Sequence, residues 1–398
     1  MELRTPVVDW ATDFDHHDQR YAEAAPSIWA ELRQRCPVAH TDRFHGAWMP
    51  VRYEDIAAVA YDTATFSSRS VVLNDRRPEE ISFVSPPITS DPPQHTAHRR
   101  VLLPQFTPQK VEELAAFTRA GCERRLDTVL EGGRADAAVD YAQHIPVMVT
   151  ARMLGLPDSD ADQFRAWVNE ILVEGPVDIE VGRRATYEVI DYFRDQVEDR
   201  RRRGGGDDLV AWVADAEIDG RPVEEKEQLG MLFLLLLAGI DTTWSTLGAS
   251  LWHLAAHPGD QDRLRADPDL LVTAIEEFLR FYAPVSVSRV IARDAEIGGC
   301  PVGGGKRVAL AFPAANRDPD VFPDADTLVL DRAENRHLAF GLGVHRCLGS
   351  NLARMVLREA LGAWMARTPP FRLDDDAPVT WTGGQVRGPR AVPVVFDG

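Results

Sequence analysis

One cysteine in this chain stands in a stretch suited to holding a metal. The stretch reads Phe340-Gly341-Leu342-Gly343-Val344-His345-Arg346-Cys347-Leu348-Gly349, and an apolar-periodic run typical of a helix follows it. A thiolate ligates a metal when the metal and backbone donors stabilise its charge. Gly341 and Gly343 permit a tight loop whose N–H groups point at sulfur, because glycine accepts positive φ. Cys347 would then precede a helix N-terminus, which favours an anion, so we interpret it as a metal ligand.

A second pattern places an acid and an alcohol in the middle of an apolar helix. The longest helical pattern spans 224–257, and Asp241 and Thr242 lie at its centre. A carboxylate on a helix that crosses the core is costly unless it is paired or functional. Gly239 weakens the helix nearby and invites a local opening of its hydrogen-bond ladder, where Thr242 can satisfy a freed carbonyl or bind water and dioxygen. A solvent-facing Asp and Thr is the alternative, which apolar residues on all sides of the helix disfavour.

Two other pairs lie at helical spacing. His95 and Arg99 are four residues apart and share a helix face suited to binding carboxylates, although an ordinary solvated face is the plainer interpretation of such a pair in isolation. Glu277 and Arg280 are three apart and can form an ion pair, which contributes little to stability when it is exposed. Neither pair identifies a function by itself.

Together these motifs resemble the cytochrome P450 family of bacterial heme-thiolate monooxygenases. The cysteine loop matches the family pattern Phe-Gly-x-Gly-x-His-x-Cys-x-Gly at all six specified positions, and the other motifs occur in the family's order. The resemblance covers the chain from roughly residue 20 to residue 398. The stretches 314–319 and 384–389 also resemble the heme domains of bacterial members that are fused to a flavin/iron–sulfur reductase.

The resemblance implies a cofactor, heme b (iron protoporphyrin IX), and a role for each motif. Cys347 would be the axial metal ligand, and Gly239, Asp241 and Thr242 would handle dioxygen and protons. The remaining residues implied to bind the cofactor are His95, Arg99, Arg289, His345, Phe340, Gly341, Gly349 and Ala238.

Further roles follow from the same resemblance. Glu277 and Arg280 would form a buried structural pair that Arg332 or His337 completes. A mostly apolar substrate pocket is expected, lined by Phe83, Val84, Ile240, Trp244, Val285 and Val287.

The implied fold is mainly α with small β-sheets (α+β). It is the triangular prism of the P450s, with heme between the long central helix and the helix after the cysteine loop. The chain has 398 residues without a Gly/Ser/Pro-rich linker, so we expect one heme-binding domain over 1–398. The longest apolar run, 229–240, is shorter than the about 20 residues of a membrane span. With no apolar signal segment, we expect a cytoplasmic protein, and a monomer.

Composition excludes several other classes. The four cysteines lack a Cys-x-x-Cys pair, which argues against a zinc ribbon or an iron–sulfur cluster in this chain. The net charge of −18 makes nucleic acid a poor partner. Local basic residues, Arg100, Arg346, Arg354 and Arg358, are candidates for docking an electron donor or for internal ion pairs.

We therefore expect a monooxygenase that inserts one oxygen atom from O2 into a small hydrophobic or aromatic substrate by hydroxylation, dealkylation or epoxidation. Electrons would come from NAD(P)H through a ferredoxin or an FMN/[2Fe-2S] reductase, separate or fused in a longer product. A heme-thiolate peroxygenase that uses hydrogen peroxide and a non-catalytic heme protein that binds or senses a gas are the alternatives. The intact pair of Asp241 and Thr242 argues against both.

Overall fold

The computed structural model describes residues 5–77 and 83–397. Helices dominate it, as the sequence predicts. Their bounds are α1 Gln19–Arg35, α2 Tyr53–Tyr61, α3 Gln94–Leu102, α4 Pro108–Glu112, α5 Ala115–Val129, α6 His144–Leu154, α7 Ala161–Asn169, α8 Ile179–Arg203, α9 Leu209–Ala214, α10 Glu225–Ala256, α11 Pro258–Ala266, α12 Leu271–Phe281, α13 Phe312–Ala315 and α14 Ser350–Arg367.

The strands are short and form small sheets. Their bounds are β1 Val38–Thr41, β2 Ala47–Pro50, β3 Phe66–Ser67, β4 Arg134–Asp136, β5 Glu217–Ile218, β6 Arg221–Pro222, β7 Ser286–Ile291, β8 Ala295–Ile297, β9 Cys300–Val302, β10 Arg307–Ala311, β11 Phe371–Leu373, β12 Thr380–Thr382, β13 Gly388–Ala391 and β14 Pro393–Phe396. The largest sheet has the order β1-β2-β10-β7-β3, and a three-stranded sheet has the order β11-β14-β4. The strands β12 and β13 form an antiparallel pair.

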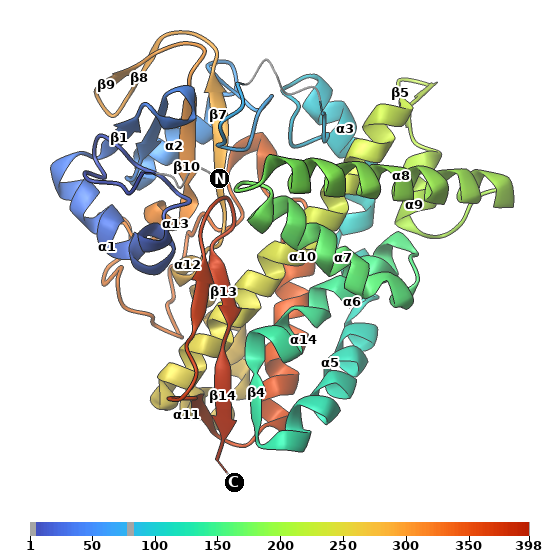
Figure 1. The fold of residues 1–398 in the computed structure, drawn as a ribbon. Coiled ribbons are helices and arrows are strands. Elements are labelled where there is room, and N and C mark those ends of the chain that lie inside the picture. Colours follow the sequence, from blue (N-terminus) through green and yellow to red (C-terminus); the bar gives the residue numbers. More distant parts are fainter. Residues whose placement is uncertain (1–4, 78–82, 398) are drawn as a thin grey trace.

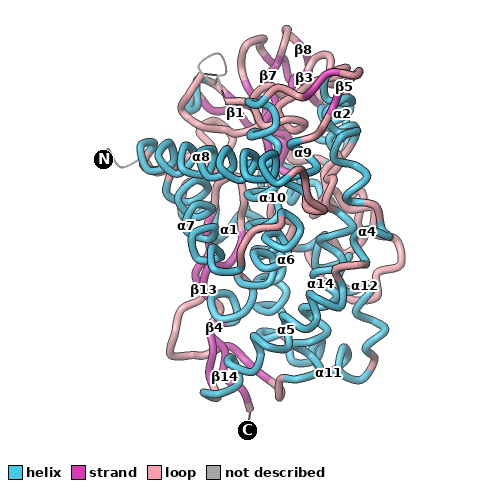
Figure 2. Tube along the Cα trace, turned by 90° about the vertical axis from the view of Figure 1, so that its right-hand side faces the viewer, coloured by secondary structure: helices cyan, strands magenta, loops and turns pink. Residues whose placement is uncertain are grey.

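The long helix α10 runs through the middle of the molecule (Figure 1). It contacts α6, α8, α14 and β13, and Figure 2 shows helices gathered around it while the largest sheet lies at one end. Within the described residues, α10 is long and apolar enough to cross a membrane by length and composition, but 72% of its most apolar window is buried in this fold. Its hydrophobicity is therefore that of a core helix.

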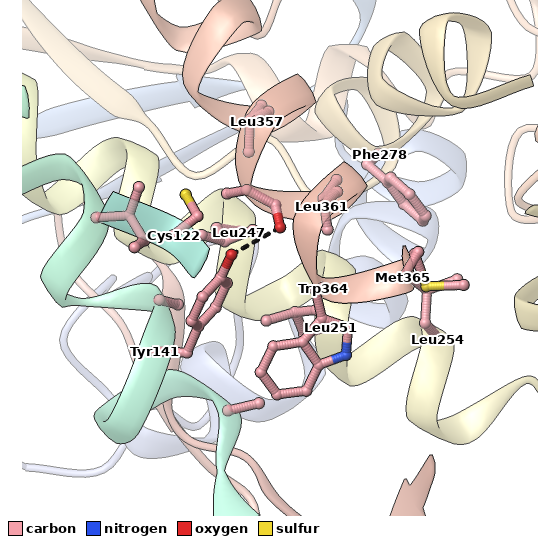
Figure 3. Packing of buried hydrophobic residues seen from close by; sticks show 14 of the residues in the cluster. Cys122, Tyr141, Leu247, Leu251, Leu254, Phe278, Leu357, Leu361, Trp364 and Met365 are labelled. Carbon is pink, nitrogen blue, oxygen red and sulfur yellow. Dashed lines mark hydrogen bonds between the residues drawn. The ribbon is translucent and has the colours of Figure 1, made fainter. Parts of the chain in front are cut away.

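A densely packed core joins α10 to α14. Trp364 is fully buried among Leu247, Leu251 and Leu361 (Figure 3). The Tyr141 hydroxyl, also buried, donates a hydrogen bond to the Ala360 carbonyl at 2.8 Å, so its polar atom is satisfied. Burying side chains of this size contributes about 1.5–3 kcal/mol each, which fixes α14 against the central helix.

The first long helix, α1, contains a proline. It begins at Gln19, because the Asp18 side chain accepts a hydrogen bond from the Arg20 N–H and caps the helix. The helix kinks at Ala24, so Pro26 begins a new run inside it.

Candidate active site

The cysteine loop has the tight backbone that its glycines predict. Gly341 and Gly343 have φ angles of 65° and 64°, in the left-handed region that favours glycine. The Cys347 N–H donates to the Phe340 carbonyl at 2.7 Å, which closes the loop just before α14. The Arg354 guanidinium lies 4.5 Å from the centroid of the Phe340 ring and anchors the loop to α14.

The Cys347 thiol is deep in the protein and yet accessible. Burial raises its pKa above the ordinary value, while the Gly349 N–H and the charges of Arg99 and Arg346 oppose that shift. The side chain is nevertheless exposed. A sulfur that lines an interior space accounts for both its depth in the protein and its exposed surface. The Gly349 N–H and the arginine charges there favour the thiolate, which is the form that ligates metals.

A cluster of donors lies close to this loop. It joins His95 and Arg99 of α3, Arg289 of β7 and His345 of the loop itself, and the two histidine rings have centroids 4.3 Å apart. Burial, together with Arg289 and His95, lowers the pKa of His345 to about 3. Burial also lowers the pKa of Arg289 to about 10, with the negative charge of Asp91 opposing it.

The donor cluster fits an anionic cofactor. His95 is 2% exposed, and neither of its ring nitrogens has a hydrogen-bond partner among the described residues. Arg99 donates to the Arg346 carbonyl at 2.7 Å instead of to a carboxylate. Buried donors without acceptors are costly, so a ligand carrying carboxylates would stabilise this arrangement. The propionates of heme meet that requirement.

Metal ligation at Cys347 requires a cofactor that supplies the other ligands. Among the described residues, no group of three or more His, Cys, Asp or Glu side chains is placed to hold a metal ion. A porphyrin provides four nitrogens of its own and needs one axial ligand from the protein. The residues present therefore fit heme.

One stripe in the middle of α10 is accessible, although the helix is otherwise buried between residues 228 and 251. Its members are spaced three or four residues apart: Leu234, Leu235, Ala238, Gly239 and Thr242. Ala238 is exposed at the centre of a core helix, which indicates that this stripe faces an interior space. Leu234 and Leu235 were not among the predicted pocket residues. They lie eight and seven residues before Thr242, a helical spacing that places them on the same face.

The local opening expected at Gly239 is not present. α10 is continuous from Glu225 to Ala256, and the Thr242 hydroxyl donates to the Ala238 carbonyl at 2.8 Å. Gly239 has a packing role instead, because a Cβ there would lie 2.7 Å from the Thr150 hydroxyl of α6. The missing side chain lets α6 approach α10 closely.

Two residues predicted to line the substrate pocket lie elsewhere. Ile240 is 0% exposed inside an aliphatic cluster, and Trp244 packs beneath the Arg390 guanidinium, 4.4 Å from its ring centroid. Each is two positions from Thr242, which turns it about 200° around a helix of 3.6 residues per turn. The prediction was therefore wrong for these two side chains.

The other predicted pocket residues stay compatible with that role. The Phe83 ring contacts the Phe233 ring of α10, with centroids 4.8 Å apart. Val285 and Val287 alternate with Arg289, so the three side chains share one face at β7. Residues 78–82, which precede the predicted pocket residues Phe83 and Val84, lie outside the described residues.

Asp241 does not share the accessible stripe. Its side chain is 1% exposed, and its Oδ1 accepts a hydrogen bond from Arg390 Nη1 of β13 at 2.6 Å. The sequence gives no local signal for this partner, because 149 residues separate the two.

The predicted pair of Glu277 and Arg280 forms in the core of α12, with both side chains 0% exposed. Arg280 Nη2 lies 2.7 Å from Glu277 Oε1. Arg332 is the third member, with its Nε 3.0 Å from Glu277 Oε2. His337, the other candidate, binds Glu276 instead.

A buried thiol, a cluster of carboxylate-binding donors and an alcohol on a central helix define the class of heme-thiolate proteins. The family model described as "Cytochrome P450" matches residues 180–368. The polyketide biosynthesis cytochrome P450 PksS of Bacillus subtilis is 31% identical over 96% of this chain and 98% of its own length. The 6-deoxyerythronolide B hydroxylase of Saccharopolyspora erythraea is 33% identical over 99% of this chain and 100% of its own. The mycinamicin IV hydroxylase/epoxidase of Micromonospora griseorubida is 32% identical over 92% and 94%.

The chain belongs to the cytochrome P450 family, and it is a heme-thiolate monooxygenase. The solved structure of PksS superposes with a TM-score of 0.88 at 31% identity, covering 97% of this chain and all of that one. The structure of CYP101J2 gives a TM-score of 0.87 at 26% identity over the full length of both chains. The predicted α+β P450 fold is thereby confirmed, and so is the heme b cofactor, which members of the family hold through a cysteine thiolate.

Proposed function

We propose that Cys347 is the thiolate ligand of heme b, and that the enzyme hydroxylates or epoxidises a hydrophobic substrate held against the accessible stripe of α10. The observation that carries the proposal is the accessible Cys347 thiol beside the donor cluster of His95, Arg99, Arg289 and His345. Bound heme supplies dioxygen activation, and the thiolate ligand favours O–O cleavage.

The protein residues divide the remaining tasks. Arg99 and Arg289, together with the neutral ring of His345, bind the propionates of heme and fix its orientation. The Thr242 hydroxyl, on the accessible stripe, donates to the Ala238 carbonyl, so its oxygen can accept a hydrogen bond at the place where bound heme would supply dioxygen chemistry. The Asp241 carboxylate, one residue earlier, passes protons on toward Thr242. Leu234, Leu235 and the Phe83 and Phe233 rings exclude water and select an apolar substrate.

Relatives narrow the class of substrates to screen. Two carry names that specify a macrolide-type substrate, 6-deoxyerythronolide B and mycinamicin IV, and a third is named for polyketide biosynthesis. We propose a hydrophobic compound of this kind or a smaller aromatic one. Purified holoenzyme titrated with such compounds should shift its heme from low to high spin for the right class only.

An electron donor of the ferredoxin or FMN/[2Fe-2S] type is proposed as the redox partner in the cytoplasm. Of the four arginines considered for docking it, Arg354 pairs with Glu276, and Arg358 pairs with Glu112 and Glu359. The exposed side chains of Arg100 and Arg346 are left as docking candidates. Raising the ionic strength should slow ferredoxin-driven turnover if they take part.

The test of the proposed function uses Cys347→Ala in the holoprotein. We expect the variant to lose the red-shifted Soret band of the ferrous–CO complex, because that shift requires thiolate ligation. Cys300→Ala, which removes a half-buried thiol on β9, should keep the band and serves as the control. A Cys347→Ala protein that retains the band would overturn the assignment.

A turnover assay separates the monooxygenase from its alternatives. NAD(P)H with ferredoxin should support product formation, and peroxide alone should support less. The reverse order would identify a peroxygenase, and no product with either would favour a gas-binding protein.

A further inference from the structure

An unusual group of polar atoms lies where β13 packs against α10. Arg390 Nη1 binds Asp241 Oδ1, but Asp241 Oδ2 and Arg390 Nε and Nη2 are buried without hydrogen-bond partners in the described part of the chain. The indole N–H of Trp244 and the hydroxyl of Ser245 are buried and unpartnered as well. These four residues form one junction. Trp244 and Ser245 lie three and four residues after Asp241, on the same face of α10, and the Arg390 guanidinium lies over the Trp244 ring.

The backbone brings the strand unusually close to the helix at this point. A Cβ on Gly388 would lie 2.4 Å from the Ser245 Cβ, and a Cβ on Gly248 would lie 3.2 Å from the Pro389 ring. Glycine at both positions therefore seats β13 on α10 (Figure 1). This contact fixes the depth at which the Arg390 guanidinium reaches Asp241.

The chemistry of the unpartnered atoms specifies their ligand. They comprise a carboxylate acceptor, three nitrogen donors and a hydroxyl that can both donate and accept. Leaving such groups dry costs about 1–3 kcal/mol each, whereas one water makes two to four hydrogen bonds with groups of this kind. The Arg390 side chain is 17% exposed while Asp241 is 1% exposed, so the arginine connects the buried acid with the surface.

We propose that this junction is an internal water site and that Arg390 is a positioning residue for proton delivery, which holds the Asp241 carboxylate in contact with that water. The inference rests on the proposed function and adds the route by which protons reach Thr242. Water at the junction transfers a proton to Asp241 Oδ2, and Asp241 passes a proton on toward the Thr242 hydroxyl. Bulk solvent returns a proton to that water past the partly exposed Arg390 side chain, whose own charge does not change, so protons balance over one transfer.

The test compares Arg390→Gln with Arg390→Lys in the holoenzyme, with ferredoxin-driven and peroxide-driven turnover measured side by side. Hydrogen peroxide brings its own protons, so a proton-delivery role predicts different effects on the two assays. For Arg390→Gln we expect dioxygen-driven turnover to fall by about tenfold or more and its solvent isotope effect to change, with peroxide-driven turnover within about twofold of wild type. Arg390→Lys keeps the positive charge and should recover part of the loss.

Two controls keep the outcome interpretable. Arg372→Gln alters an exposed arginine of β11 and should leave both assays unchanged. Ser245→Ala keeps the Asp241–Arg390 ion pair but removes the unpartnered hydroxyl of the junction. This variant should change the solvent isotope effect, and it tests the proposal even if Arg390→Gln does not fold. Wild-type rates and isotope effects in both Arg390→Gln and Ser245→Ala would overturn the proposal.

Different results contradict the proposed function and the water site. A wild-type enzyme without the ferrous–CO band or without any turnover would contradict the proposed function. A dry junction would contradict the water site alone, with the band and the turnover intact. A high-resolution crystal structure of the holoenzyme provides a direct check. Ordered water within hydrogen-bond distance of Asp241 Oδ2 and Arg390 supports the site, and a dry junction contradicts it.

Discussion

Two buried acids in this protein, Glu277 and Asp241, each pair with an arginine, and the two arginines differ in how completely their polar atoms are bonded. Arg280 uses all its N–H groups, donating to both Glu277 oxygens and to the Asn316, Ala325 and Thr327 carbonyls. Arg390 has one hydrogen bond, to Asp241, and two buried nitrogens without partners among the described residues. A fully bonded pair is fixed in place, while an incompletely bonded one retains capacity for water. If the proposed function holds, the comparison distinguishes a structural pair from one that takes part in proton delivery.

The largest expected effect tests the structural pair. Glu277→Gln leaves Arg280 and Arg332 as buried cations without a full counter-charge, so the free energy of unfolding should fall by about 3–5 kcal/mol. Denaturant titration of the holoprotein measures this change in the free energy of unfolding. Glu180→Gln is the matched control, because Glu180 and Arg183 have the same three-residue spacing on an exposed helix face. That substitution should cost less than about 1 kcal/mol. Equal losses in the two variants would refute the distinction.

The Asp241–Arg390 pair should tolerate the corresponding change better. Asp241→Asn keeps the shape of the side chain, and Arg390 can take up water because it is partly exposed. We expect a loss of about 1–2 kcal/mol in the free energy of unfolding, with a much larger effect on dioxygen-driven turnover. A loss of stability as large as that of Glu277→Gln would show that both pairs are structural.

The smallest expected effect sharpens the comparison with a third acid, Glu276, next to Glu277 on α12. Burial raises the pKa of Glu276, but hydrogen bonds from Arg354 and His337 outweigh it and lower the pKa to about 2, from an ordinary value of 4.5. The unfolded chain therefore binds this proton more readily, and stability should decline as the pH falls from about 4.5 to about 2.

Arg354→Gln removes the main partner of Glu276 and should reduce that acid dependence. Denaturant titrations of both proteins at several pH values within this window measure it. An unchanged pH slope in the variant would contradict the assigned cause.

Local signals in the sequence predicted much of the fold. The helical pattern predicted over 224–257 corresponds to α10, Glu225–Ala256. Local residues also set the bounds of α8, because the Asp178 side chain caps its start and Gly204, with φ of 80°, ends it. The cysteine loop and the pairing of Glu277 with Arg280 depend on residues close together in sequence, so they could also be anticipated.

Features that depend on distant segments could not be predicted. Arg390 reaches Asp241 only because β13 packs on α10, and the sequence pattern says nothing about that approach. The contact between the tilted rings of His95 and His345 likewise joins two remote segments, which only the family resemblance linked. The resemblance implied pocket roles for Ile240 and Trp244, but it does not fix their direction, because each residue of a helix turns the side chain by about 100°.

The seating of β13 on α10 makes the partner of a buried acid depend on a segment near the end of the described residues. Proteolytic removal of residues 388–397 would leave the cysteine loop and α10 in the chain but would take Arg390 away from Asp241. Such a clipped chain would retain the groups proposed to bind heme, while a buried carboxylate lost its counter-charge.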